Sequence, residues 1–207
     1  MTNEPKWLEW ARELQALSQI GLTFSTNEHE RANFQRLAEI AAEMAQDQTG
    51  MDSAHLLQTF KVQPGYATAK IDVRGAVVRE GKILLVQERS DQLWCMPGGW
   101  ADVGEYPSSM VAREVLEESG FTVQPVKVVG DFDANRAGRR LQFFHAYKIV
   151  FLCQIVSGEP QTSIETQDVA FFDFNDLPDL SPNRTNVRHL QEVQAHLLDP
   201  ARAAAFD

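Results

Sequence analysis

The sequence predicts an α/β fold, with a mixed sheet, preceded by a small all-helical N-terminal module. Apolar residues recur every three to four positions before Gly65. From Tyr66 they form runs typical of strands, interrupted by one helical stretch and followed by another. At 207 residues the chain is long for one average domain and short for two. The expected domains are therefore residues 1–65, a packing or dimerisation module, and residues 66–207.

Composition limits the classes of function. Hydrophobic residues make up 43% of the chain, enough for a buried core, and the formal net charge is -10. This charge argues against a general nucleic-acid binder, which needs clustered Lys and Arg, and it fits a protein that recruits divalent cations. We expect no signal peptide, no membrane span and a cytoplasmic location. Cys95 and Cys153, in apolar strand-like surroundings, are expected to be buried, reduced thiols.

Three helices are expected in the N-terminal module. The first carries an apolar stripe that includes Trp7 and Trp10 as core residues, and it is expected to end at Gly21. The second begins at Asn27, whose side chain can cap it, with Glu30 at the reciprocal position of a capping box. A short third helix follows. The module has five Lys or Arg residues against nine Asp or Glu, which does not favour a DNA-reading helix-turn-helix.

Strands are expected from Tyr66 onward. Residues 71–78 and 82–87 are two β-rich runs joined at Glu80-Gly81, a signal for a tight hairpin. Further strand-like runs are "LWCMPGG", "TVQPVKVVGDFDA", "LQFFHAYKIVFLCQIV" and "DVAFFDFNDLP". The last helix follows "SPNRTN", and its expected inward residues are Val187, Leu190, Val193 and Leu197.

A central helix is expected between Pro107, which suits a first turn, and Gly120, which suits the position after the last turn. On one side of it, Glu114, Glu117 and Glu118 stand at positions i, i+3 and i+4 of one turn. Like charges at these spacings repel, so solvent, a basic partner or a metal ion must compensate them. The expected buried stripe of the opposite side is Met110, Val111, Val115 and Leu116.

The glycines before this helix connect the carboxylates to a chemistry. Gly98, Gly99 and Gly104 allow the loop to fold back, so that its backbone approaches whatever the carboxylates hold. Clustered carboxylate oxygens, without cysteine or paired histidines, suit Mg²⁺ or Mn²⁺ better than zinc. Such a cation normally shares its shell with phosphate oxygens, which indicates attack of water on phosphorus in a phosphorylated substrate. A solvated acidic helix face is the alternative.

The stretch from Gly99 to Phe121 resembles the Nudix box of the Nudix hydrolases. The charged and glycine positions of the box are matched by Gly99, Glu105, Arg113, Glu114, Glu117, Glu118 and Gly120. The resemblance implies an α/β/α sandwich in which Glu117 and Glu118 are metal ligands and Glu114 is a ligand or lies on the side of the base. It also implies that the carbonyl of Gly99 joins the metal shell. A salt bridge between Glu105 and Arg113 would brace the loop against the helix.

The general base is not set by the box. In the family it is either a box glutamate or an acidic residue on a later loop. The later candidates are Glu165 and Asp168 in "SIETQDVAFF", and Glu165 is favoured. A solvated turn is the alternative for both residues.

A wider resemblance covers most of the chain. The helical N-terminal segment, "GYATAKIDVRGAVVREGKILLVQE" and "LWCMPGGWADVGEYP" are similar to a bacterial Nudix subfamily that hydrolyses nucleoside diphosphates linked to a second moiety, X. The resemblance implies ADP-ribose or CDP-choline as the type of substrate, Mg²⁺ or Mn²⁺ as the cofactor, and a homodimer. Neither nucleic acid nor membrane is an expected partner. Ala69 departs from the subfamily pattern, in which proline is expected.

Candidate contacts to the substrate are arginines and aromatic residues. The first candidates are Arg74, Arg89 and Arg136, followed by Arg139, Arg140, Phe143, Phe144 and Tyr147. A surface salt bridge is the alternative for Arg89, and a solvated loop is the alternative for the arginines after residue 135. A different class of function is a non-catalytic regulator that senses a nucleotide. The complete box and the acidic N-terminal module favour catalysis instead.

Overall fold

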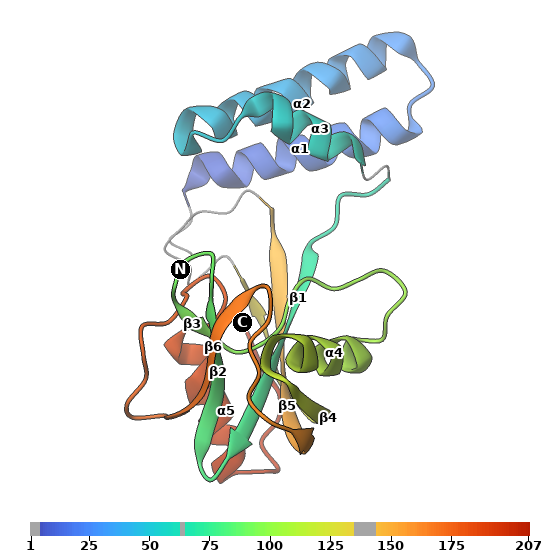
Figure 1. The fold of residues 1–207 in the computed structure, drawn as a ribbon. Coiled ribbons are helices and arrows are strands. Elements are labelled where there is room, and N and C mark those ends of the chain that lie inside the picture. The colour runs from blue at the N-terminus through green and yellow to red at the C-terminus, as the bar shows by residue number, and fades with distance from the viewer. Residues whose placement is uncertain (1–4, 63–64, 135–143) are drawn as a thin grey trace. The chain divides into compact units, whose positions relative to one another are not determined.

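The computed structural model describes residues 5–62, 65–134 and 144–207, and the chain forms two compact units. The first unit contains the chain up to Ala69 together with a short segment that ends at His145, and the second contains the other residues from Lys70 onward. Figure 1 labels their helices and strands. In the described part of the chain, each helix is either too short or too polar to cross a membrane.

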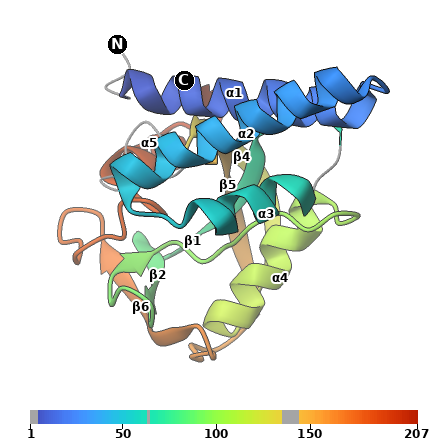
Figure 2. The ribbon, with the colours of Figure 1, turned by 90° about the horizontal axis from the view of Figure 1, so that it is seen from above.

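Three helices form the first unit: α1 (Lys6–Phe24), α2 (Glu28–Thr49) and α3 (Ser53–Val62). Figure 2 shows α1 and α2 side by side, with α3 next to them. Small side chains dominate their common core, which allows the helix backbones to approach closely. The buried members of this core are Leu8, Ala11, Ala38, Ala42, Ala45 and Leu56.

The predicted end of the first helix at Gly21 is wrong, because α1 continues to Phe24. Gly21 lies against Phe34 of α2, and a Cβ atom at Gly21 would stand 2.4 Å from the ring of Phe34. This glycine therefore permits close packing between two helices. Helical spacing alone does not distinguish that use of glycine from a helix end.

The predicted start of the second helix at Asn27 is confirmed. The Asn27 side chain accepts hydrogen bonds from the backbone N–H groups of His29 and Glu30. Glu30 does not complete the predicted capping box in this way, since its carboxylate accepts a hydrogen bond from the hydroxyl group of Ser25 at 2.6 Å. The cap thus satisfies free N–H groups of the first turn, with Ser25 as an additional partner.

Helix α1 has a second apolar face. Trp7 packs against the helical core as predicted, but Trp10 is 54% exposed, so the prediction of a core position is wrong for Trp10. Leu17 and Phe24 are exposed as well. These three exposed side chains are spaced by seven residues, which places them on one side of a helix.

The second unit is a mixed sheet with helices. Its strands are β1 (Lys70–Arg79), β2 (Lys82–Glu88), β3 (Trp94–Cys95), β4 (Phe121–Asp133), β5 (Ala146–Gly158), β6 (Thr166–Asp173) and β7 (Ala205–Phe206), and its helices are α4 (Pro107–Ser119) and α5 (Val187–Leu198). The strand order is β3-β2-β1-β5-β4-β7, with β6 paired to β2. Strand β1 is parallel to β5, whereas β2 pairs antiparallel with β1 and β4 pairs antiparallel with β5. The predicted mixed sheet is confirmed.

Alternation along the central strands builds two cores. In β2, Leu84 and Val86 join the buried cluster that contains residues of α4, whereas Ile83 and Leu85 join the cluster that contains residues of α5. Figure 1 shows these two helices on opposite sides of the sheet. The predicted α/β/α sandwich is therefore confirmed.

The hairpin between β1 and β2 determines what lies beside β1. It turns at Glu80 and Gly81, whose φ angles of 53° and 76° are both positive, as a tight hairpin requires. The predicted turn is confirmed. The two strands pair only at Val78–Ile83 and Arg79–Lys82, next to the turn. The earlier part of β1 is therefore open to another partner on that edge.

Helix α4 begins at Pro107 and is followed by Gly120 with φ 78°, both as predicted. Its buried face differs from the predicted stripe. Leu116 is 46% exposed, and Glu118 is only 5% exposed. A face that contains Met110, Val111 and Val115 continues to Glu118 and Ser119, because positions three and four residues apart share one side of a helix, and Leu116 lies outside that face. The predicted burial of Leu116 is thus wrong, and a carboxylate takes the inward position.

The inward face of α5 also differs from the prediction. Val187 and Leu197 are exposed. The cap residue Asn186 forms reciprocal hydrogen bonds with His189, and this histidine is turned inward. The buried residues of α5 are His189, Leu190, Val193 and His196.

The buried His189 predicts a loss of stability in acid. Burial, with Lys148 as the next cause, lowers the pKa of His189 to about 3. Because this value lies below the unfolded value of about 6.5, stability from the neutral ring is present above that value and is lost as the pH falls toward 3. Between pH 8 and pH 5, the free energy of unfolding should fall by about 2 kcal/mol more in the natural chain than in His189→Gln.

Chemical denaturation at the two pH values measures this difference. His29→Gln, which replaces an exposed histidine at the start of α2, is the matched control and should behave like the natural chain. An equal acid loss in His189→Gln and in the natural chain would contradict the assignment.

Candidate active site

The glycine loop, residues 96–101, lies along the edge of β1 that β2 leaves open. Three backbone hydrogen bonds of 2.8–2.9 Å hold it there: Val73 N–H to Gly99 O, Gly75 N–H to Pro97 O, and Ala101 N–H to Ile71 O. Each bond joins the loop to a residue of β1 that has no partner in β2. The loop thus replaces a strand at the middle of the sheet.

Gly98 is needed for this close approach. Its φ of 144° is rare for residues with a side chain, and a Cβ atom at Gly98 would lie 2.0 Å from the carbonyl oxygen of Val73. A larger residue would therefore separate the glycine loop from β1.

Two glutamates of α4 lie against the glycine loop. The Gly98 N–H donates a hydrogen bond to Oε2 of Glu118 at 2.8 Å. Glu114 lies against the next residue of the loop, since a Cβ atom added at Gly99 would stand 2.9 Å from its Oε2. Glu117 lies on the outer side of the same turn, with a side chain that is 57% exposed. The three predicted carboxylates therefore have three different degrees of exposure.

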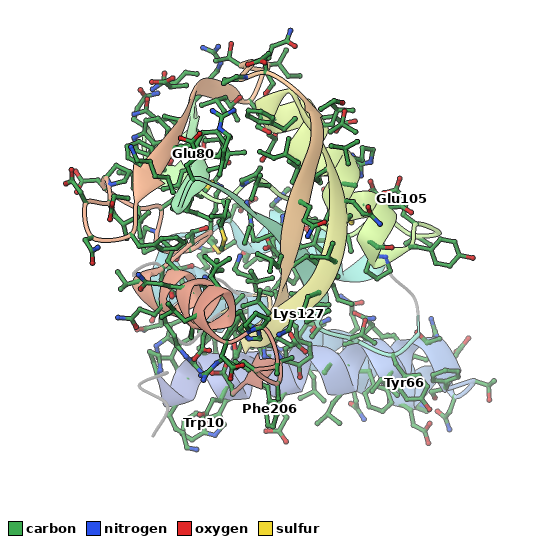
Figure 3. The ribbon with its side chains drawn as sticks, turned by 90° about the horizontal axis from the view of Figure 1, so that it is seen from below. Trp10, Tyr66, Glu80, Glu105, Lys127 and Phe206 are labelled. Atoms are coloured by element: carbon green, nitrogen blue, oxygen red, sulfur yellow. The ribbon has the colours of Figure 1, made fainter. Side chains whose placement is uncertain are left out.

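Arg113 is a basic partner of the carboxylates. Its guanidinium group forms ion pairs with Asp102 at 2.8 Å, Glu105 at 3.0 Å, Glu114 at 3.0 Å and Glu117 at 2.9 Å. An ion pair between Glu105 and Arg113, as the family resemblance implies, is thus present. Figure 3 labels Glu105 where the loop runs beside α4. Solvent, a basic partner or a metal ion was expected to offset the repulsion between the glutamates of α4. The structure shows a basic partner, and it comes from the same chain.

Burial makes the carboxyl groups of Glu118 and Glu114 weaker acids than they would be in water. It raises the pKa of Glu118 to about 8, opposed by Arg74 and the Gly98 N–H and supported by the nearby Glu88. Burial also raises the pKa of Glu114, opposed by Arg113. A cation placed beside them would favour their ionised forms.

The donor chemistry of the site fits a hard cation. Carboxylate oxygens are ligands that Mg²⁺ and Mn²⁺ prefer, and the carbonyl of Gly99, which accepts one hydrogen bond from Val73, has a second lone pair. Over the described ranges, however, no three His, Cys, Asp or Glu side chains are grouped so that they could hold a metal ion. Glu114 and Glu117 contact Arg113 instead. A cation held by Glu114 and Glu117 would therefore have to displace Arg113 from them.

The first residue of β6 reaches the C-terminal end of α4. The hydroxyl group of Thr166 donates to the carbonyl of Glu118 at 2.9 Å, and the N–H of Arg89 donates to the carbonyl of Glu165 at 2.9 Å. Glu165 is exposed and adjacent to Thr166. Asp168 is also exposed and lies further along β6. Of the two predicted candidates for the base, Glu165 is next to the residue that binds α4.

The arginines predicted as substrate contacts have different surroundings. Arg89 is exposed, with its guanidinium 3.4 Å from the carbonyl oxygen of Ser163. Arg74 is 4% exposed and donates to the carbonyl of Met96 in the glycine loop. Arg136 lies outside the described residues. The further candidates Arg139, Arg140 and Phe143 lie outside them too, while Phe144 packs in the helical core and Tyr147 belongs to β5.

The sequence analysis missed a buried charged cluster beside the glycine loop. The carboxylate of Asp72 accepts hydrogen bonds from Arg74 at 2.9 and 2.8 Å and from Lys148, its partner in register, at 2.7 Å. Glu88, buried at the end of β2, pairs with Arg184 at 3.3 Å. A signal was available, because Asp72 and Arg74 are charged residues two apart in a run that otherwise reads as a buried strand.

Two family models match the chain. A UDP-X-like, N-terminal oligomerisation domain matches residues 5–60, and a NUDIX domain matches residues 70–192. A similar curated protein is YjhB of Bacillus subtilis, provisionally named an ADP-ribose pyrophosphatase. It is 37% identical over 204 residues, which are 99% of this chain and 98% of the relative.

Solved structures with the same fold include two that are named as pyrophosphate-cleaving enzymes. An ADP-ribose pyrophosphatase from Streptococcus suis is 36% identical, with a TM-score of 0.62 over 68% of this chain and 100% of its own. A UDP-X diphosphatase is 29% identical, with a TM-score of 0.63 over 97% of this chain and 98% of its own.

The close approach of the glycine loop to β1 predicts unequal effects of two alanine substitutions. Gly98 and Gly104 both have positive φ, but a Cβ atom at Gly104 would meet nothing within 4 Å. Gly104→Ala should therefore lose only about 1 kcal/mol of stability through backbone strain. Gly98→Ala should lose about 2–3 kcal/mol more through its clash with Val73. Chemical denaturation measures both, and equal losses would contradict the close approach.

Proposed function

Because the chain belongs to the Nudix hydrolase family, we propose that it hydrolyses the pyrophosphate bond of a nucleoside diphosphate linked to a second group, X. The observation that carries the proposal is the position of Glu114 and Glu118 against the Gly98–Gly99 backbone. Carboxylates beside a closely packed backbone would be suited to hold a divalent cation, which would supply positive charge to a pyrophosphate. The products are a nucleoside monophosphate and phospho-X.

The relatives support ADP-ribose and UDP-linked compounds as the first substrates to consider, since their names contain these two. From ADP-ribose the products are AMP and ribose 5-phosphate. CDP-choline, which the sequence resemblance also implies, yields CMP and phosphocholine. We propose the cytoplasm as the compartment, because Cys95 and Cys153 are free, buried thiols.

Nudix hydrolases in general use divalent cations, and we propose Mg²⁺ or Mn²⁺ for this chain. Glu114, Glu117 and Glu118, with the Gly99 carbonyl, would hold it, and the ion would supply positive charge to the pyrophosphate oxygens. If Glu114 and Glu117 turned to a cation, the ion pairs of Arg113 with Asp102 and Glu105 would remain to brace residues 102–105 against α4.

In the reaction, water attacks one phosphorus and the bond from that phosphorus to the bridging oxygen breaks. We propose that Glu165 accepts the proton of the water, because it is exposed and adjacent to Thr166, which binds the end of α4. Arg89, exposed beside the same segment, is the proposed contact to phosphate. Arg136 is a proposed contact on sequence alone.

The N-terminal unit supports a homodimer. Its matched family model is an oligomerisation domain, and Trp10, Leu17 and Phe24 form an exposed apolar face on α1. Figure 3 labels Trp10 where its ring projects from α1. We propose that this face packs against the same face of a second copy, since a two-fold interface needs one self-complementary patch.

A substrate panel tests the hydrolytic function. ADP-ribose, a UDP-linked sugar and CDP-choline are incubated with Mg²⁺ or Mn²⁺, and the released nucleoside monophosphate is measured. Glu118→Gln should lower kcat at least about 100-fold, whereas Glu80→Gln, at the exposed hairpin turn, should leave it within about twofold. Full activity in Glu118→Gln would refute the assignment of Glu118.

The same panel separates the candidates for the base. Glu165→Gln should lower kcat about 10²–10³-fold and Asp168→Asn less than about threefold, because only the first removes the proposed proton acceptor. The reverse order would assign the role to Asp168. Activity that survives both substitutions would place the base among the glutamates of α4. Inactivity of the natural chain on every compound would favour the alternative function, a regulator that senses a nucleotide.

The oligomeric state tests the proposed dimer. Leu17→Asp should shift the chain from dimer to monomer in analytical ultracentrifugation, because a charge at the centre of an apolar interface is strongly unfavourable. Leu198→Asp is the matched control, since this leucine is also exposed but lies in α5. A monomeric natural chain, or a dimeric Leu17→Asp, would refute the interface.

A further inference from the structure

Met96, at the start of the glycine loop, has both of its backbone polar groups bound by buried side chains. Its N–H donates to Oγ1 of Thr185 at 2.9 Å, and its carbonyl accepts a hydrogen bond from Nη1 of Arg74 at 3.2 Å. All three residues are buried. The two partners come from separate segments, since Thr185 is 89 residues after Met96 and Arg74 is 22 residues before it.

Thr185 is itself fixed in position. Its N–H donates to the carbonyl of Ser181 at 2.7 Å, which closes a turn before α5. Ser181 in turn donates its N–H to Trp94 of β3 at 2.8 Å. The neighbouring Arg184 forms ion pairs with Glu88 at 3.3 Å and with Asp91 at 2.8 Å. The hydroxyl group of Thr185 is therefore presented to Met96 by a segment that is anchored on the sheet.

Arg74 is fixed as firmly. Asp72 accepts two hydrogen bonds from its guanidinium, and Lys148 binds the same carboxylate. Buried ion pairs of this kind contribute little net stability compared with apolar side chains, because removing the charges from water is costly. What this cluster does provide is a donor held in one orientation toward the carbonyl of Met96.

We propose that Thr185 and Arg74 are positioning residues for hydrolysis: by holding Met96, they set the place of the Gly98 N–H that binds Glu118. Pro97 lies between Met96 and Gly98, and its ring restricts φ, so a displacement at Met96 passes on to Gly98. Arg74, predicted from the sequence as a substrate contact, thereby acts through the loop. The inference rests on the proposed hydrolytic function.

Thr185→Val tests the inference, because valine has nearly the shape of threonine and lacks the acceptor for Met96. We expect kcat to fall about 10–100-fold, as for other small misplacements of catalytic geometry, with KM changed less than about threefold. Thr185→Ser keeps the hydroxyl group and should restore kcat to within about threefold of the natural chain. Arg74→Lys keeps a cation beside Asp72 but loses the fork of donors, and kcat should fall in the same direction.

A binding measurement gives a readout that does not depend on turnover. In a calorimetric titration with Mn²⁺ alone, the affinity for Mn²⁺ should be reduced at least about tenfold in Thr185→Val and recovered in Thr185→Ser. Leu56→Ala is the control for general destabilisation. It shortens a buried side chain of α3 in the core of the helical unit, a core that does not contain Met96. It should lower stability but keep both kcat and the affinity for Mn²⁺.

The outcomes separate the inference from the function on which it rests. If Thr185→Val had the same kcat and the same Mn²⁺ affinity as the natural chain, the positioning role would be overturned and the proposed hydrolysis would stand. Equal losses in Thr185→Val and Thr185→Ser, or in Leu56→Ala, would overturn it as well, since the hydrogen bond would not be the cause. A natural chain that binds Mn²⁺ but hydrolyses nothing would refute the proposed function, and the Mn²⁺ titration would then decide only whether Thr185 and Arg74 position the carboxylate site. A natural chain that neither binds Mn²⁺ nor hydrolyses any compound of the panel would overturn both.

Discussion

The pairing of the glycine loop with β1 is the constraint on which the candidate site depends. Strand β2 pairs with β1 only near the hairpin, and the loop takes the open edge with three backbone hydrogen bonds. Gly98 permits this contact because a side chain there would meet the backbone of β1. Once the loop is held on the sheet, α4, which packs on one face of that sheet, brings Glu114 and Glu118 against it. The carboxylates are thus positioned by backbone pairing rather than by one another.

Charge is balanced differently on the two sides of the glycine loop. On the outer side Arg113 binds four carboxylates, in an arrangement that is partly exposed and can exchange partners. On the inner side Asp72 is enclosed by Arg74 and Lys148, all buried. Water screens the outer set, so its side chains are free to respond to a ligand. The inner set has no access to water and keeps one geometry. The glycine loop thus lies between a rigid charged cluster and an adaptable one.

The helical unit shows how one helix can serve two contacts. Leu8 and Ala11 of α1 face α2 and α3, whereas Trp10, Leu17 and Phe24 face outward. A periodic pattern predicts that a helix is apolar on some side, but two apolar stripes on one helix merge into a single broad signal. For this reason the sequence analysis assigned both tryptophans to one core. The position of Gly21 was ambiguous in a similar way, because a glycine there can end a helix or let another helix approach closely. In the structure it lets α2 approach, and it does not end α1.

The sequence by itself determined the order and kind of the elements apart from the short β7, the hairpin at Glu80-Gly81, the limits of α4 and the identity of the family, because these depend on local spacing and on a contiguous motif. It did not determine which side of α4 or α5 is buried, since Leu116 and Glu118, or Leu197 and His196, differ by only one or two positions. It also could not join Thr185 and Arg74 to Met96, or Lys148 to Asp72, because those contacts link residues far apart in the chain. Only the tertiary structure decided them. Burial and hydrogen bonding at each of these positions depend on neighbours that local sequence does not contain.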